Sequence, residues 1–185
     1  MSNIQINGKT HKFMLNGTEY FGGKSLNDGG DLGIELLCEG SAIGNDTEEK
    51  VDYSSLTEGA NFSEYLSYNH TSKEFTVVKA CTVFIIPWTY NYDTASGSYS
   101  HGEFYINGTK EANWVVDYRG EGYYAGKPIV KDLSVGDTMY GYTPSSDGYP
   151  QQKVKIYRID STLKSLFINM MKFNNENGGI GKVIT

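Results

Sequence analysis

The chain has 185 residues, of which 38% are hydrophobic and 21% are charged, and this is enough for one domain with a buried core. Its net charge is −6 and its lysines and two arginines form no basic cluster, which excludes the positive surface that a nucleic-acid backbone needs. The longest apolar run, CTVFIIPW at 81–88, is far shorter than the roughly 20 residues of a membrane-spanning helix. We therefore expect no nucleic-acid partner and no membrane insertion.

The first 33 residues have the pattern of small hairpins followed by a linker. Asn7-Gly8 and Asn16-Gly17 are hairpin-turn dipeptides, and residues 21–33 are rich in glycine. Short strands are expected around these turns, at 4–6, 11–15 and 18–20. The opening MSNIQINGKTHKF lacks an apolar core of signal-peptide length, so we expect no signal peptide and folding in the cytoplasm of the producing cell. We predict that residues 1–33 attach the protein to another molecule.

Residues 34–160 are predicted to form the main domain, an antiparallel β-sandwich. The segment 34–40 fits a strand or a short helix, and the polar segment 41–64 is predicted to be loop with at most one helical turn. Strand patterns then recur about every ten residues with turn signals between them, which is typical of a sandwich or barrel. These strands are expected at 75–79, 82–86, 103–106, 113–118, 128–130, 138–142 and 153–159.

One turn in this region can be specified more closely. Within SHGEFYINGTKEANW (100–114), the dipeptide Asn107-Gly108 follows a run of strand-forming residues. Asn and Gly both tolerate the positive φ that the two central residues of a type I′ turn require. The sequence therefore predicts a two-residue hairpin at Asn107-Gly108.

Residues 161–185 are predicted to be an amphipathic helix followed by a flexible arm. Asp160 or Ser161 can cap the helix. Its apolar stripe at i, i+3, i+4, i+7 and i+8 comprises Leu163, Leu166, Phe167, Met170 and Met171. The polar arm begins at residue 174. The helix is expected to pack on its own domain, and the alternative is an arm that docks on a neighbouring molecule.

Chemistry-bearing motifs are missing from the sequence. It has no phosphate-binding loop, zinc-protease motif, CxxC pair or nucleophile elbow. The oxygen-bearing stretch NDGGD at 27–31 lacks the further ligands of a calcium loop, and Cys38 and Cys81 lie in apolar surroundings that favour buried free thiols over a disulfide. We expect no cofactor, no metal and no enzymatic activity; scattered carboxylates such as Glu103, Asp117 and Glu121 leave a hydrolase as a third hypothesis.

Aromatic side chains supply the candidate site. In PWTYNYD (87–93), alternate residues of an extended segment lie on one face. The candidate contact residues are Trp88, Tyr90, Tyr92, Trp114, Tyr123, Tyr124 and Tyr149. Such rings beside polar groups can stack on sugars, but they are also enriched in cores and subunit interfaces. Both alternatives stay open on the sequence alone.

Several segments resemble the jelly-roll heads of the complement and tumour-necrosis-factor superfamily, which also occur on bacteriophage fibres and other virion proteins. They are YNHTSKEFTVVKACTVFIIPWTYNY, EFYINGTK, KDLSVGDTMYGYT and KVKIYRI, within residues 68–159. The likeness covers about half of the chain and includes the Leu-x-x-Gly-Asp turn at Leu133–Asp137. The resemblance implies an all-β, antiparallel jelly-roll sandwich that assembles as a homotrimer through aromatic and aliphatic side chains.

These features together favour a non-enzymatic structural or adhesion protein of a bacteriophage virion. Residues 1–33 or the C-terminal arm would contact other virion proteins, and the displayed head would bind a cell-surface glycan or protein. The alternative hypothesis is a bacterial carbohydrate-binding β-sandwich module.

Overall fold

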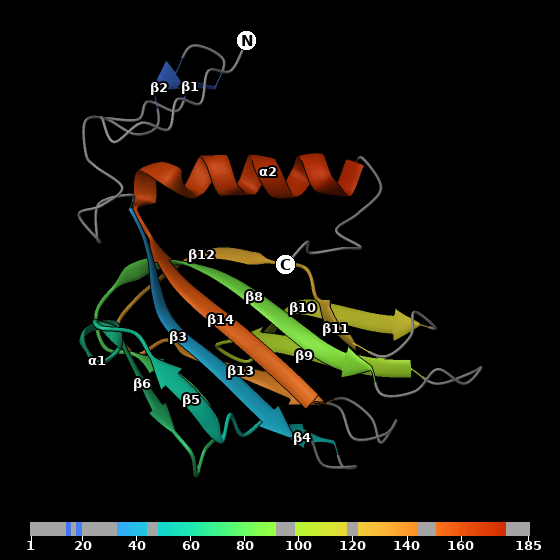
Figure 1. Cartoon of the computed structure of the whole chain (residues 1–185). Helices are drawn as coiled ribbons and strands as arrows, with labels where there is room; N and C mark the ends of the chain where they lie inside the picture. Colours follow the sequence, from blue (N-terminus) through green and yellow to red (C-terminus); the bar gives the residue numbers. More distant parts are fainter. Residues whose placement is uncertain are drawn as a thin grey trace.

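The computed structural model describes residues 14–15, 18–19, 33–43, 48–91, 99–117, 122–143 and 151–176. Most of these residues lie in two six-stranded antiparallel sheets that pack face to face (Figure 1). This confirms the predicted all-β sandwich. The strands of the sandwich run from Ile34 to Ile159, and the division of the chain into three domains stays a prediction.

The first sheet has the strand order β10-β9-β13-β7-β6, and β4 pairs with the end of β13. Its strands are β4 (Glu49–Lys50), β6 (Leu66–Asn69), β7 (Glu74–Val77), β9 (Tyr99–Ile106), β10 (Thr109–Asp117) and β13 (Thr138–Thr143). The second sheet has the order β11-β8-β14-β3-β5, and β12 pairs with the first half of β8. Its strands are β3 (Ile34–Ile43), β5 (Ser55–Glu58), β8 (Cys81–Asn91), β11 (Gly122–Ala125), β12 (Ile129–Leu133) and β14 (Gln151–Ile159).

The strand pairs are nested along the chain. β3 pairs with β14, β7 with β13, β8 with β12 and β9 with β10, so the chain resembles one long hairpin folded over on itself. The two sides of that hairpin are shared between the two sheets, which is the jelly-roll arrangement. Outside the sandwich, β1 (Met14–Leu15) and β2 (Thr18–Glu19) pair antiparallel, with Leu15 opposite Thr18. The turn predicted at Asn16-Gly17 and the strand expected at 4–6 lie outside the described residues.

Alternation along the strands builds the core. In β13, for example, Met139, Gly141 and Thr143 are buried, while Tyr140 and Tyr142 are half-exposed. Inward-facing side chains of both sheets meet in one cluster, in which large members include Leu37, Tyr53, Phe75, Ile85, Phe104 and Ile156. Area-based estimates put the burial of each such side chain at about 1.5–3 kcal/mol.

Tyr53 occupies the space between the two sheets. It lies in the segment that passes from β4 in the first sheet to β5 in the second, and its side chain is fully buried. A Cβ atom on Gly40 of β3 would lie 3.0 Å from the Tyr53 ring, and one on Gly141 of β13 would lie 2.4 Å from its hydroxyl oxygen. Both glycines are therefore required by the tyrosine that passes between them.

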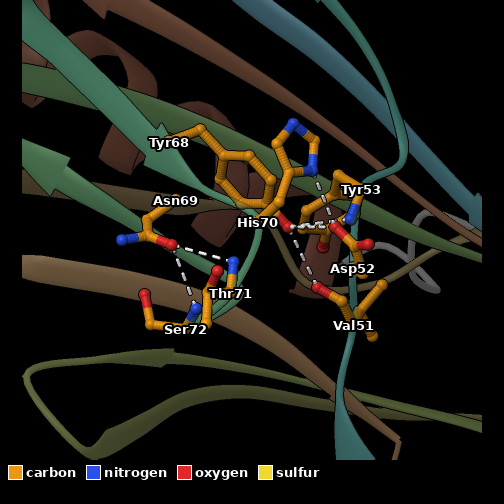
Figure 2. Close-up of polar contacts among 8 residues, drawn as sticks. All are labelled: Val51, Asp52, Tyr53, Tyr68, Asn69, His70, Thr71 and Ser72. Atoms are coloured by element: carbon orange, nitrogen blue, oxygen red, sulfur yellow. Dashed lines mark hydrogen bonds and ion pairs between the residues drawn. The ribbon is translucent and has the colours of Figure 1, made fainter.

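A polar network fixes the backbone around Tyr53 (Figure 2). The hydroxyl of Tyr68 in β6 accepts a hydrogen bond from the Tyr53 backbone N–H at 2.8 Å and donates to Asp52 Oδ1 at 3.2 Å. His70 Nδ1 lies 3.1 Å from the same carboxylate oxygen. Burial and the neighbouring Asp52 raise the pKa of Tyr68 well above its ordinary value, so its hydroxyl stays a donor at neutral pH.

One sequence prediction is wrong, and the structure decides between the two alternatives left open for another. The segment 41–64 is not simply loop, because it contains the end of β3, all of β4 and β5, and the helical turn α1 (Phe62–Tyr65). β5 is exposed and polar because it is an edge strand, and edge strands carry little of the apolar signal on which the prediction relied. The segment 34–40 is a strand, and a bulge at Leu37 puts both Leu37 and Cys38 in the core.

The C-terminal helix forms as predicted, and Asp160 is its cap. The Asp160 carboxylate accepts a hydrogen bond from the Thr162 backbone N–H at 2.8 Å, which starts the 3-10 turn η2 (Ser161–Leu163). α2 (Lys164–Glu176) follows and extends into the segment that was predicted to be the arm. It packs on its own domain across one end of the second sheet (Figure 1), where the ring centroids of Phe167 and Phe84 lie 4.6 Å apart.

The predicted type I′ turn is also present. Asn107 and Gly108 have φ values of 51° and 72°, and Thr109 pairs directly with Ile106. The Asn107 side chain joins this hairpin to the turn after β12, because it donates to Asp137 Oδ1 at 2.9 Å and accepts from the Thr138 backbone N–H at 2.9 Å. Two separate Gly-containing turns thus form one unit.

We expect Gly108→Val to destabilise the protein by about 1–3 kcal/mol, because valine is strained at positive φ. Thr109→Val, one residue along, replaces one β-branched exposed residue with another and is the matched control. Equal thermal melting of the two variants and the wild type would contradict the turn assignment.

Gly141→Ala should cost about 1–3 kcal/mol of unfolding free energy, because the new methyl group overlaps the Tyr53 hydroxyl. The same substitution in a Tyr53→Phe background should cost less, since the overlapping oxygen is gone. Urea denaturation of the four proteins in this cycle measures the difference. Identical costs in both backgrounds would show that Tyr53 is not the obstacle.

Asp137→Asn should weaken the pH dependence of stability on the acid side. Hydrogen bonds from the Ser134 backbone N–H and the Asn107 side chain lower the pKa of the Asp137 carboxyl. A lowered folded-state pKa adds stability above the unfolded value, near 4, and this stability is lost as the pH falls through the lowered pKa. The wild type should therefore be the more stable protein at pH 7, and thermal melts of the two should converge as the pH falls below about 4.

Candidate contact surface

The outer face of the second sheet brings three of the predicted aromatic residues together. Trp88 and Tyr90 point outward from β8, and Tyr123 of β11 lies directly opposite Tyr90. The Tyr90 and Tyr123 rings meet edge to face with centroids 4.7 Å apart, and Tyr123 is 38% exposed. The prediction that Trp88 and Tyr90 share one face of an extended segment is confirmed.

Lysines of β14 lie among these rings. Lys153 pairs in register with Trp88, and its Nζ atom stands 4.0 Å from the centroid of the Tyr123 ring. Lys155 is two residues along on the same face, 5.9 Å from the Trp88 ring centroid and 3.3 Å from a carboxylate oxygen of Glu39. The Tyr123 hydroxyl donates to Gln151 Oε1 at 2.7 Å, which holds this ring beside the first residue of β14.

We call this set of residues the Trp88 surface: Glu39, Trp88, Tyr90, Tyr123, Gln151, Lys153 and Lys155. It contains a hollow of about 150 Å³, which is lined by all of these residues except Tyr90 and Gln151. Farther along the same face, Phe167 of α2 packs on Phe84, whose ring centroid lies 6.1 Å from that of its neighbour Tyr157. The helix therefore protects one end of the face, and the Trp88 surface occupies the other.

The other predicted contact residues lie elsewhere. Tyr124 is adjacent to Tyr123 and so points to the opposite side of β11, where it packs against the core. Trp114 belongs to β10 in the first sheet, opposite Gly102 of β9, and thus to a different part of the molecule. Tyr92 and Tyr149 lie outside the described residues.

A second aromatic group, which the sequence analysis missed, lies on the outer face of the first sheet. The rings of Tyr105 and Tyr140 are stacked with centroids 5.0 Å apart, and Tyr142 meets Tyr105 edge to face at 5.9 Å. Lys50 Nζ stands 4.4 Å from the Tyr140 ring centroid and pairs with Glu74 at 2.7 Å. We call this group, with Lys50, the Tyr140 surface.

The charge of Glu103, which lies next to the Tyr140 surface, is balanced by its neighbours. Its buried carboxylate accepts from the Tyr105 hydroxyl at 2.5 Å and pairs with Lys110. The hydrogen bond with Glu103, followed by burial, raises the pKa of Tyr105 to about 12. Glu103 is thus engaged in a structural network. Of the other carboxylates considered for hydrolysis, Asp117 contributes only its backbone to the described structure, and Glu121 lies outside it.

Both cysteines are free thiols. Burial raises the pKa of Cys38 to about 12, and burial also raises the pKa of Cys81, so both stay protonated at neutral pH. Cys81 lines an open cleft of about 530 Å³ in which each charged side chain has a partner; Arg158, for example, lies 3.0 Å from Glu35.

Among the described residues, no three His, Cys, Asp or Glu side chains are placed to hold a metal ion. The NDGGD stretch lies outside the described residues. No helix in the described part of the chain is long and apolar enough to cross a membrane.

Comparison with known proteins gives structural neighbours only. No family model and no curated protein matches the sequence. Among solved structures, the zebrafish complement 1qA globular domain has 10% identity and a TM-score of 0.44, with 64% of this chain and 94% of that chain covered. Rabbit GITRL has 6% identity and a TM-score of 0.41 (63% and 91% covered), and Eiger TNF from S. frugiperda has 6% identity and a TM-score of 0.40 (68% and 94% covered). The jelly-roll assignment rests on the strand order described above.

Proposed function

We propose that this chain is a non-enzymatic binding head, displayed as a homotrimer on a bacteriophage virion and used in attachment to the host cell. The observation that carries the proposal is the Trp88 surface. Aromatic rings and lysines on a rigid sheet supply contact area with little loss of side-chain freedom on binding, and they lie outside the core that holds the fold together.

Display and assembly are supported by the organisation of the chain. The β1–β2 hairpin precedes the sandwich along the sequence, separated from it by the glycine-rich residues 21–33, as expected of an attachment element with a linker. A trimer would present three copies of the Trp88 surface, and three weak contacts with a cell-surface glycan or protein would add up through avidity. Residues 1–33 or the end of the chain would contact other virion proteins.

We expect the purified chain to have a mass in solution of three times its 20.6 kDa chain mass. Light scattering coupled to gel filtration, at micromolar concentration, measures this directly. A clean monomer for the wild type would exclude the homotrimer.

A monomeric carbohydrate-binding module is the second candidate, and the hollow beside Trp88 is the observation that favours it. An aromatic ring at the edge of a polar hollow can stack on a sugar ring. Trp88→Ala should then abolish binding on a glycan array without changing the melting temperature. Array binding that survives this substitution would exclude Trp88 as the sugar platform.

A further inference from the structure

Lys153 differs from the other lysines around the two aromatic surfaces in its charge environment. Lys155 pairs with Glu39, Lys50 with Glu74 and Lys110 with Glu103. Within the described residues, no carboxylate lies within ion-pair distance of Lys153. Its cross-strand neighbours are Ser41 on one side and Trp88 on the other, and its ammonium group rests over the Tyr123 ring.

A cation in this position can attract an anion. The chain as a whole carries a net charge of −6, but the Trp88 surface holds two lysines and one glutamate, so its own charge is positive. A cation–π contact holds the ammonium group in place without neutralising it, because the ring has no net charge. An anionic group that reaches Lys153 would therefore supply the partner that the described part of the chain does not.

The groups beside Lys153 indicate what else the ligand carries. The Trp88 ring offers an apolar face in register with Lys153. The Gln151 carbonyl oxygen is engaged by the Tyr123 hydroxyl, and no described group accepts from the Gln151 amide NH₂, which can donate to a hydroxyl. The hollow of about 150 Å³ is smaller than the roughly 300–1,000 Å³ of an enclosed ligand site, so it suits one ring of a larger molecule.

We infer that the Trp88 surface binds an acidic sugar residue, with Trp88 under the sugar ring and Lys153 against its carboxylate or sulfate group. This inference rests on the proposed function of the chain as a binding head, and it names the ligand class of that same surface.

The test uses the full-length protein and three trisaccharides: trigalacturonate, sulfated galactotriose and uncharged galactotriose. Calorimetric titration should show binding of at least one acidic trisaccharide and at least ten-fold weaker binding of the uncharged one. Lys153→Gln should weaken the acidic complex at least ten-fold and make its affinity less sensitive to salt, whereas Lys153→Arg should retain it. The carboxylated and sulfated arms distinguish the two sources of negative charge.

Lys50→Gln on the Tyr140 surface is the matched control, because Lys50 also lies over a tyrosine ring but has a carboxylate partner. It should leave the acidic complex unchanged. Equal affinity for charged and uncharged sugars, no effect of Lys153→Gln, or an equal loss in Lys50→Gln would each overturn the inference. Melting temperatures of all variants should match the wild type, since none of these lysines lies in the core.

Mass measurements on the same samples separate this inference from the proposed trimer. A wild-type monomer that binds the acidic sugar through Lys153 would exclude the homotrimer and support the site. Loss of the trimer in Trp88→Ala and Lys153→Gln, with no sugar binding by the wild type, would show that the surface is a subunit contact. That result would overturn the inference while leaving the displayed trimer in place.

Discussion

The packing of Tyr53 between two glycines determines how closely the sheets of this protein approach. Gly40 belongs to one sheet and Gly141 to the other, and a side chain on either would meet the tyrosine. Tyr53 also lies on the segment that crosses from one sheet to the other. The residue that sets the distance between the sheets therefore also fixes where the chain crosses between them. The centroid of its ring lies 5.7 Å from that of Phe75 in β7, and its backbone N–H donates to the Tyr68 hydroxyl in β6. Tyr53 therefore also connects β6 and β7 to the core. Close packing of this kind leaves little room for compensating changes nearby.

The packing of the core determines which side chains are available on the outer faces of the two sheets. Once alternate residues of each strand are committed to the core, the remaining ones must face outward, and here they include the aromatic residues and lysines of the Trp88 and Tyr140 surfaces. On the first sheet the lysines are balanced by Glu74 and Glu103, and the rings stack on one another. On the second sheet α2 covers one end, and at the other end no carboxylate of the described residues lies within ion-pair distance of Lys153. The two faces therefore differ in charge balance more than in residue type, and this difference favours the second sheet as the binding face.

Two turn residues, Asn107 and Asp160, connect neighbouring elements through hydrogen bonds of their side chains. Asn107 supplies the backbone conformation of its hairpin and also bonds to Asp137 and to the backbone of Thr138. It thereby fixes the end of β9 against the start of β13, its neighbour in the sheet. The Asp160 cap directs the chain from β14 into α2 and thus over the second sheet. Local hydrogen bonds of the loops therefore set which part of each outer face stays available.

The sequence by itself determined the elements whose signals are local: the alternating strands, the Asn107-Gly108 turn and the amphipathic helix with its Asp160 cap. It also indicated the jelly roll, because the strand and turn motifs occur in a characteristic order. It did not reveal β5, whose edge position removes the apolar pattern, nor the purpose of Gly40 and Gly141. For the candidate site, alternation placed Trp88 and Tyr90 together, but Lys153, Tyr123 and Glu39 join them only through the pairing of strands whose partner residues lie more than 30 positions apart in the chain. Of the two lysines on this surface, Lys155 reaches Glu39 because β14 pairs with β3, so the charge balance of the surface was decided by the tertiary structure.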